Sequence, residues 1–198
     1  MTNFQKNIKR IFDLFLSVIC IIILLWFILL LLIISSIDTK KFGFFFQDRI
    51  GFKGKVFRVI KIRTMNSNKK NNTTVTTIND SRITRLGKFL RKYKLDELPQ
   101  LFNVLKGEMS FVGPRPDVKG FADKLEGNDS IILSVKPGIT GPATLFFKNE
   151  ELLLAKQQNI EEYNKTVIWP KKVELNRLYV ENYSFKKDIY YIFKTILS

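Results

Sequence analysis

The chain of 198 residues contains no histidine and a single cysteine, Cys20. Without histidine it cannot supply a Ser–His or Cys–His pair, a histidine-ligated zinc site or a histidine proton shuttle. A lone cysteine forms neither an intrachain disulfide nor a cysteine metal cluster. Walker-type phosphate loops and dinucleotide-binding glycine motifs are also absent from the sequence. Carboxylates must therefore carry any acid–base or nucleophilic chemistry.

Charge is missing from one long segment. The run from Leu14 to Ile37 has no charged residue, no proline and no glycine. As a helix, it is long enough to cross a hydrocarbon core about 30 Å thick. We therefore predict a membrane-embedded N-terminal helix over residues 1–38, followed by one domain over residues 39–198.

The topology of this helix has two readings. Lysines and arginines flank the run on both sides, so the positive-inside bias favours a cytoplasmic location for the larger C-terminal part and resists export of the N-terminal tail. A re-entrant helix would satisfy both flanks, but a return is expected to need a proline or glycine break. A straight spanning helix would leave the N-terminus outside.

Acidic residues are scarce relative to basic ones: 18 against 33, for a formal net charge of +15. A basic surface attracts any polyanion, including nucleic acid. No recognisable nucleic-acid module accompanies the charge, and the apolar run points to a membrane. We therefore expect anionic lipid and phosphate substrates as partners, and no nucleic acid.

The clearest candidate for chemistry is the adjacent pair Asp96 and Glu97. An apolar i, i+3, i+4, i+7 pattern follows it and predicts a helix that begins at the pair, with Pro99 in the first turn. That pattern comprises Leu98, Leu101, Phe102 and Leu105. A helix start of this kind can be purely structural. If the pair is functional, a hard cation, most plausibly magnesium, is the metal that Asp96, Glu97 and a diphosphate would share.

Basic residues surround the carboxylate pair in the sequence. Upstream, a predicted helix repeats a cation every three residues, at Arg82, Arg85, Lys88 and Arg91. Downstream, Arg115 stands between two prolines, which restrict the backbone on both sides. A row of cations is also typical of a solvated face, but here it adjoins two carboxylates, as an anion-binding site would.

The remaining segments predict a helix-rich mixed α/β domain. Residues 44–65 are expected to form a short β-hairpin around the turn at 51–54, and its second strand carries Lys61. Residues 66–80 are predicted to be a loop, 136–142 a glycine- and proline-rich loop, and 150–158 and 171–183 helices. The last stretch, from Phe185, is an amphipathic helix that suits the membrane interface but could instead cover the protein core.

Several of these segments together resemble the bacterial sugar transferase family, specifically its small monotopic phosphoglycosyl transferases. The resemblance lies in KRIFD at 9–13, FQDRIG at 46–51, FRVIKIRTM at 57–65 and KPGITG at 136–141. It is densest in LDELPQLFNVLKGEMSFVGPRP at 95–116.

The resemblance implies transfer of a phosphosugar from a UDP-sugar to a polyprenyl phosphate such as undecaprenyl phosphate, with release of UMP. Residues 39–198 would then form a membrane-associated catalytic domain at the cytoplasmic face of a bacterial inner membrane, and the reaction would begin a lipid-linked glycan. Asp96 would be the nucleophile that forms a covalent phosphosugar intermediate, and Glu97 would support Mg²⁺. Lys61, Arg91, Arg115 and, in the FQDRIG segment, Arg49 are the expected phosphate-binding cations. The sugar and the oligomeric state stay open.

Two departures from the family pattern stand out. Members typically have a Ser-Pro pair that kinks the membrane helix, where this chain has Leu25-Trp26. Many continue after Gly141 with Trp-Ala-Gln, where this chain has Pro142-Ala143-Thr144. The alternative from another functional class is a non-catalytic basic adaptor that docks on anionic membrane and recruits glycan-assembly enzymes. For such an adaptor, Asp96 and Glu97 would only start a helix.

Overall fold

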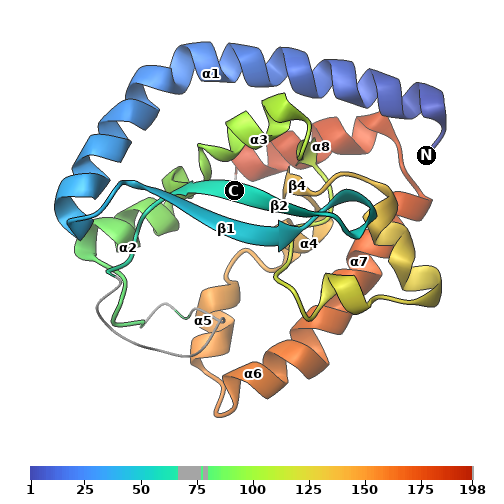
Figure 1. Cartoon of the computed structure of the whole chain (residues 1–198). Coiled ribbons are helices and arrows are strands. Elements are labelled where there is room, and N and C mark those ends of the chain that lie inside the picture. The colour runs from blue at the N-terminus through green and yellow to red at the C-terminus, as the bar shows by residue number, and fades with distance from the viewer. Residues whose placement is uncertain (67–76, 78–79, 198) are drawn as a thin grey trace.

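The computed structural model describes residues 1–66, 77 and 80–197, in which one long helix arches over a small mixed α/β domain (Figure 1). The α-helices of this part of the chain are α1 (Asn3–Thr39), α2 (Arg85–Lys92), α3 (Gln100–Lys106), α4 (Pro142–Phe146), α5 (Glu150–Ala155), α6 (Ile160–Tyr163), α7 (Trp169–Glu181) and α8 (Phe185–Ile196). Its strands are β1 (Phe44–Ile50), β2 (Val56–Ile62), β3 (Ser110–Val112) and β4 (Gly138–Thr140). The expected helix-rich mixed α/β class is confirmed.

Shorter helical turns connect these elements. The 3₁₀ turns are η1 (Phe52–Gly54), η2 (Leu95–Glu97), η3 (Ala122–Lys124) and η4 (Gly127–Ser134). The π-helical turn η5 (Asn164–Ile168) joins α6 to α7.

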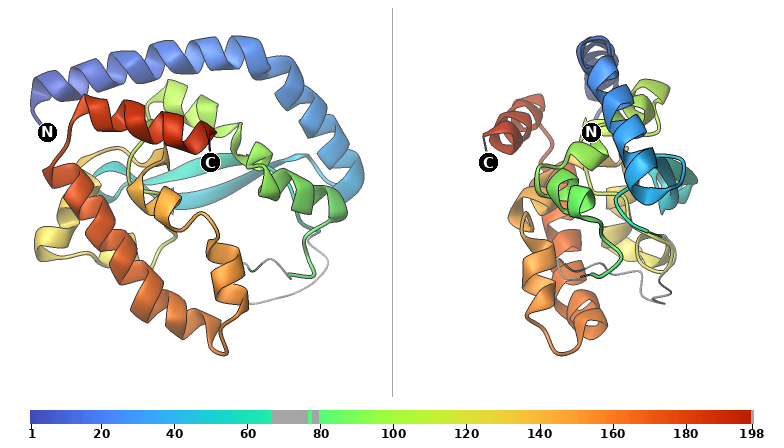
Figure 2. Two further views of the ribbon diagram at one scale, coloured as in Figure 1. Left: turned by 180° about the vertical axis from the view of Figure 1, so that it is seen from behind. Right: turned by 90° about the vertical axis from the view of Figure 1, so that its left-hand side faces the viewer.

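Helix α1 is continuous and curved, and the domain holds it near both ends (Figures 1 and 2). Toward its N-terminus, the buried Asp13 accepts hydrogen bonds from the Ser110 hydroxyl and the Phe111 N–H, both at 3.1 Å. Toward its C-terminus, Ser35 Oγ donates to the Arg63 carbonyl at 2.7 Å. The helix thus returns to one domain without a proline or glycine break.

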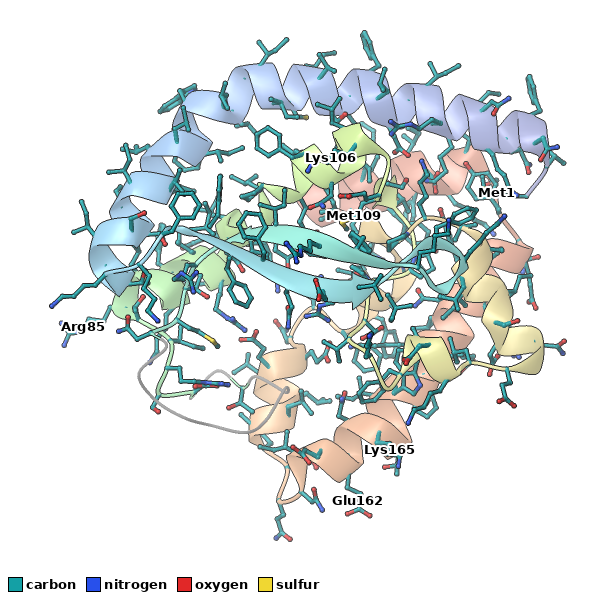
Figure 3. All side chains as sticks on the ribbon, viewed as in Figure 1. Met1, Arg85, Lys106, Met109, Glu162 and Lys165 are labelled. Atoms are coloured by element: carbon teal, nitrogen blue, oxygen red, sulfur yellow. The ribbon has the colours of Figure 1, made fainter. Side chains whose placement is uncertain are left out.

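The outer side of α1 carries large apolar side chains with no other part of the described chain over them (Figure 3). Ile22 is 72% exposed and Trp26 66% exposed. By length and composition, α1 could cross a membrane, and little of it is buried against the protein. This exposure agrees with a membrane-embedded helix, because such side chains are rarely left in water in so large a patch.

A buried polar network joins the start of α1 to the C-terminal helices. Lys9 Nζ lies 2.6 Å from Asp188 Oδ2, and the hydroxyls of Tyr179 and Tyr183 donate to the same carboxylate at 2.6 and 3.1 Å. Asp188 is 1% exposed. Because a buried carboxylate needs partners, this network fixes α8 against α1 and α7.

The predicted hairpin is confirmed. β1 and β2 pair antiparallel from Phe44 opposite Ile62 to Ile50 opposite Val56, around the turn at residues 51–54. Behind the hairpin, Leu31 of α1 packs with Ile62 of β2 and Leu90 of α2. Leu95 and Leu98, which flank the carboxylate pair, pack on the same cluster. Helix α1 and the candidate site therefore share one small core.

The second sheet is a short parallel pair, β3 with β4, in which Ser110 lies opposite Gly138 and Val112 opposite Thr140. The two segments approach too closely for a side chain. A Cβ on Gly138 would lie 2.1 Å from the Gly113 nitrogen, and one on Gly141 would lie 2.4 Å from the Gly113 oxygen. The glycines of the predicted loop at 136–142 are thus required by backbone packing.

Other predicted elements have these outcomes. The helices expected at 150–158 and 171–183 correspond to α5 and α7. The basic helix begins only at Arg85, so the prediction that Arg82 belongs to it is wrong, and Arg82 pairs instead with Asp80 at 2.6 Å. Most of the loop expected at 66–80 lies outside the described residues. On α8, Tyr191 and Ile192 pack on the protein core, whereas Tyr190, Phe193 and Ile196 are exposed.

The Lys9–Asp188 pair gives a stability prediction. In Lys9→Met, Asp188 keeps its tyrosine donors but loses its counter-charge in a buried site, so we expect a loss of about 3 kcal/mol in the free energy of unfolding. Urea unfolding of the detergent-solubilised protein measures it. Lys171→Met is the matched control, because the Lys171–Glu174 pair is 41% and 45% exposed and its loss should cost less than about 1 kcal/mol. Equal losses in the two variants would contradict the analysis.

Candidate active site

The carboxylate pair Asp96 and Glu97 lies in the 3₁₀ turn η2, just before α3. Both side chains are buried, at 6% and 8% exposure. The sequence predicted a helix that begins at this pair. Instead, α3 begins about one turn later, with Pro99 at its N-cap. Lys94, in the left-handed conformation with φ of 55°, separates η2 from α2. The local turn thus points two acidic side chains into the protein.

Glu97 is held by two cations from different parts of the chain. Its Oε1 lies 3.0 Å from Lys61 Nζ on β2 and 2.6 Å from Arg115 Nη2. Burial alone would raise the pKa of Glu97, but the positive charges of Arg115 and Lys61 outweigh it and hold the pKa well below the ordinary value. In turn, the Glu97 carboxylate raises the pKa of Arg115. Glu97 is therefore a fixed anion between two fixed cations.

The position of Arg115 follows from the second sheet. β3 ends at Val112, and Gly113 lies directly against the Gly138 backbone. The Gly138 N–H donates to the Pro114 carbonyl at 2.8 Å. With prolines on both sides, the backbone of Arg115 has little freedom, so the predicted role of this turn in presenting the guanidinium is consistent with the geometry.

Asp96 differs from its neighbour. Its Oδ1 is buried and has no hydrogen-bond partner among the described residues. Burial, assisted by the adjacent Glu97 charge, raises the pKa of Asp96, although Lys61 and Arg91 act in the opposite direction. An unpartnered carboxylate oxygen beside cations is the arrangement that a nucleophile needs, because no hydrogen bond has to be broken before it reacts.

The other two predicted cations lie around this centre with partners of their own. Arg49 on β1 donates to Gln47 Oε1 at 2.8 Å and to the Pro116 carbonyl at 3.2 Å, which ties the hairpin to the turn that carries Arg115. Burial and the charge of Arg115 lower the pKa of Arg49. Arg91 on α2 pairs with Glu151 on α5, and its Nε is buried without a partner. The structure therefore brings all four predicted cations toward Glu97 and Asp96, with only Lys61 and Arg115 in direct contact with a member of the pair.

Sequence reasoning missed a second acidic pair in this region. Glu150 and Glu151 begin α5 and bind cations from two other helices: Glu150 lies 2.8 Å from Lys172 on α7, and Glu151 binds Arg91 on α2. Asp117 lies next to the turn that carries Arg115. Burial raises the pKa of Asp117, although the charges of Lys172 and Arg49 act in the opposite direction. Two adjacent acidic residues at the start of a predicted helix could have indicated this second pair. No sequence pattern indicated that Lys172, within a helix, would be its partner.

Among the described residues, no group of three or more acidic, histidine or cysteine side chains could hold a metal ion by itself. Magnesium does not require one, since it commonly uses one or two carboxylates together with substrate phosphates and water. The unpartnered Asp96 Oδ1 and the less engaged Glu97 Oε2, 3.4 Å from Arg115 Nη1, are hard oxygen donors suited to it.

The fold and site together define a domain with a long apolar N-terminal helix and a buried carboxylate pair set among cationic side chains. The sequence matches the bacterial sugar transferase family over residues 4–198, and the chain belongs to that family.

Three relatives illustrate the match. An uncharacterized sugar transferase of Haemophilus influenzae is 39% identical over 164 residues, covering 75% of this chain and 31% of that protein. The UDP-N-acetylgalactosamine-undecaprenyl-phosphate N-acetylgalactosaminephosphotransferase of Aeromonas hydrophila is 33% identical over 193 residues, covering 96% and 43%. The UDP-glucose:undecaprenyl-phosphate glucose-1-phosphate transferase of Klebsiella pneumoniae is 36% identical over 194 residues, covering 95% and 39%. The chain thus spans less than half the length of these three relatives.

The low pKa of Glu97 predicts how stability depends on pH. A carboxylate whose pKa is lowered by folding stabilises the protein above its unfolded value of 4.5, and that contribution is lost as the pH falls through the folded value. Glu97→Gln should therefore be less stable than the parent by about 3 kcal/mol at pH 7. The difference should shrink as the pH falls below 4.5.

Urea unfolding at a series of pH values measures this difference, with Glu174→Gln as the exposed control. A gap between parent and Glu97→Gln that stayed constant through the acid range would mean that the ion pairs do not depress the pKa of Glu97.

Proposed function

We propose that this chain transfers a phosphosugar from a UDP-sugar to a polyprenyl phosphate such as undecaprenyl phosphate, releases UMP and so starts a lipid-linked glycan. The observation that carries the proposal is that two adjacent buried carboxylates differ in their ion-pair and hydrogen-bond partners. Glu97 is ion-paired through Oε1 with Lys61 and Arg115, whereas Asp96 Oδ1 has no partner among the described residues. The relatives named for UDP-sugars and undecaprenyl phosphate support the substrate class.

In the proposed first step, an Asp96 carboxylate oxygen attacks the phosphorus that bears the sugar. The new O–P bond forms as the bond from that phosphorus to the bridging oxygen breaks, and UMP leaves with the electron pair. The product is an acyl phosphate that joins Asp96 to the phosphosugar. Two steps replace one difficult displacement between two phosphates.

In the second step, a phosphate oxygen of the polyprenyl phosphate attacks the same phosphorus. The bond to Asp96 breaks, the carboxylate is regenerated, and a polyprenyl diphosphosugar is formed. No proton needs to move at the reacting atoms in either step, which agrees with a site that has no histidine.

In this mechanism the cations offset the electrostatic repulsion between the attacking carboxylate and the diphosphate. Arg115 and Arg91 can bind phosphate oxygens as planar forks, whereas Lys61 acts as a point charge. Arg49 supports the turn that carries Arg115 through the Pro116 carbonyl. Mg²⁺, which we propose as the cofactor, would be held by Asp96 and Glu97 with donor phosphate oxygens and would supply further charge neutralisation.

The acceptor is a lipid, so the site has to open toward a membrane. Leu95 and Leu98 flank the carboxylate pair and pack on the cluster that contains Leu31 of α1, which supports an acceptor site close to the proposed membrane helix. The exposed part of α8 combines aromatic side chains with Lys186, Lys187 and Lys194, a composition suited to the interface with anionic lipid.

We further propose that α1 is re-entrant, with both ends on the cytoplasmic face of a bacterial inner membrane. Asp13 and Ser35 contact the same domain, and one domain cannot lie on both sides of a bilayer. Positive charge at both flanks of the apolar run favours the same arrangement.

The central test compares Asp96→Asn with the parent in UMP release from a panel of UDP-sugars, with undecaprenyl phosphate and Mg²⁺ in detergent. An amide cannot serve as the nucleophile, so turnover should fall by at least about 10³-fold. Asn has the same size as Asp, and Asp96 Oδ1 has no hydrogen bond to lose among the described residues, so the fold should persist. Glu174→Gln, an exposed change outside the site, should keep full activity.

Three outcomes would count against the proposal. Unchanged UMP release in Asp96→Asn would rule out the aspartyl intermediate. Release of UDP in place of UMP would indicate transfer of the sugar without its phosphate. A folded parent that released no UMP from any donor would favour the non-catalytic membrane adaptor.

The topology has its own test. In a Cys20→Ser background, single cysteines at Asn3 and Lys41 are treated with a membrane-impermeant maleimide in spheroplasts and in inverted vesicles. A re-entrant α1 predicts that both positions react only in inverted vesicles, because both flanks face the cytoplasm. A cysteine at position 3 that reacted in spheroplasts while position 41 did not would establish a spanning helix.

A further inference from the structure

Within the part of the chain that the structure describes, strand β2 has a strand neighbour along one edge only, because its sheet consists of β1 and β2. On the other edge, the Ile60 N–H and the Arg58 C=O face α3 and meet the side chain of Asn103. Asn103 Oδ1 accepts from the Ile60 nitrogen at 3.1 Å, and Nδ2 donates to the Arg58 oxygen at 2.7 Å. This amide therefore takes the place of a peptide group from a third strand.

Asn103 is held in one orientation. It is fully buried, at 0% exposure, and its second Nδ2 hydrogen goes to Glu108 Oε2 at 2.7 Å. A carboxylate can only accept a hydrogen bond, so the amide nitrogen must face Glu108 and the amide oxygen must face Ile60. The Glu108 N–H donates back to the Asn103 carbonyl at 3.0 Å, which fixes Glu108 to the end of α3.

The two segments joined by Asn103 are the two that carry the Glu97–Lys61 pair. Lys61 follows Ile60 on β2, and Asn103 lies on the helix that follows Glu97. The buried Met109 and Val104 pack against Val59 between the same elements. Apolar packing of this kind tolerates sliding, whereas two hydrogen bonds to consecutive outward-facing backbone groups permit one register only.

We propose that Asn103 is a positioning residue for phosphosugar transfer. It fixes α3 and η2 against β2, so that Glu97 meets Lys61 and the adjacent Asp96 oxygen stays free and aimed at the donor. A displacement of about 1 Å between reacting groups can cost about 100-fold in rate. This inference rests on the proposed function for its kinetic readout, but its structural readout is independent of turnover.

The structural readout is the reactivity of Lys61. Its side chain is 18% exposed and ion-paired with Glu97, so an amine-acylating reagent should modify it slowly, as measured by peptide mass spectrometry. In Asn103→Ala, the register is released and the acylation rate of Lys61 should rise about tenfold. Asn176→Ala is the matched control: Asn176 is a buried asparagine on α7, with an Oδ1 that has no partner among the described residues.

The kinetic readout is UMP release per folded molecule. Asn103→Ala should lower kcat about 10- to 100-fold, with the KM for the donor changed less than about threefold, because the loss is in alignment rather than in donor binding. Asn176→Ala should leave both constants unchanged after correction for the folded fraction.

Asn103→Asp adds a pH signature and keeps the size of the side chain. The introduced carboxylate would face Glu108 and the Arg58 carbonyl with no hydrogen to donate, so activity at pH 8 should be low. As the pH falls, the two carboxyl groups share a proton and a donor is restored. The ratio of its kcat to that of the parent should therefore rise toward acid pH.

The outcomes separate the two proposals. Unchanged Lys61 acylation and unchanged kcat in folded Asn103→Ala would overturn the positioning role, as would losses matched by Asn176→Ala. If Asn103→Ala does not fold, a flat pH ratio for Asn103→Asp overturns it. Faster Lys61 acylation in Asn103→Ala, with no UMP release by the parent, would confirm that Asn103 positions Lys61 against Glu97 but would reject the proposed function.

Discussion

The burial of the Glu97 carboxylate is the constraint on which the site depends. An ionised carboxylate removed from water costs several kcal/mol unless cations and hydrogen bonds replace its hydration. Here Lys61 and Arg115 supply both. They come from β2 and from the turn after β3, so the pairing of one buried charge brings together three segments that are far apart in the sequence.

The same constraint shapes the rest of the domain. Arg115 reaches Glu97 only because Gly113, Gly138 and Gly141 let two backbone segments approach without side chains between them. β3, which leads into that turn, is held by Asp13 of α1. Arg10 donates to the carbonyls of Val104 and Leu105 at the end of α3. The start of α1 thus touches both segments that carry Glu97 and Arg115, so the position of α1 and the assembly of the site are mechanically connected.

Sequence patterns predicted the parts of this structure that depend on local physics. The hairpin follows from β-branched strands around a glycine turn, α1 from an uncharged run, and the site from adjacent acids with nearby cations. The sequence could not predict that α1 returns to its own domain, because continuous curvature leaves no proline or glycine signal. The sequence patterns also gave no sign of the role of Asn103, which lies between the apolar residues Phe102 and Val104 and yet is completely buried. Its partners are backbone groups of another element, and tertiary contacts of this kind leave no trace in periodicity.

The contrast between Asp96 and Glu97 explains how neighbouring carboxylates can have different roles. Burial acts on both in the same direction, toward a raised pKa. Two directly bonded cations reverse the effect at Glu97, whereas Asp96 feels its cations only at longer range and feels the Glu97 charge beside it. Environments that drive two pKa values apart are typical of sites that assign separate tasks to chemically similar groups. Ionised Asp96 is less stabilised than ionised Glu97, and a less stabilised anion is the better nucleophile. In the reaction that we propose, Glu97 serves best by remaining paired, since its ion pairs hold Lys61 and Arg115 at the carboxylate pair before a phosphate binds.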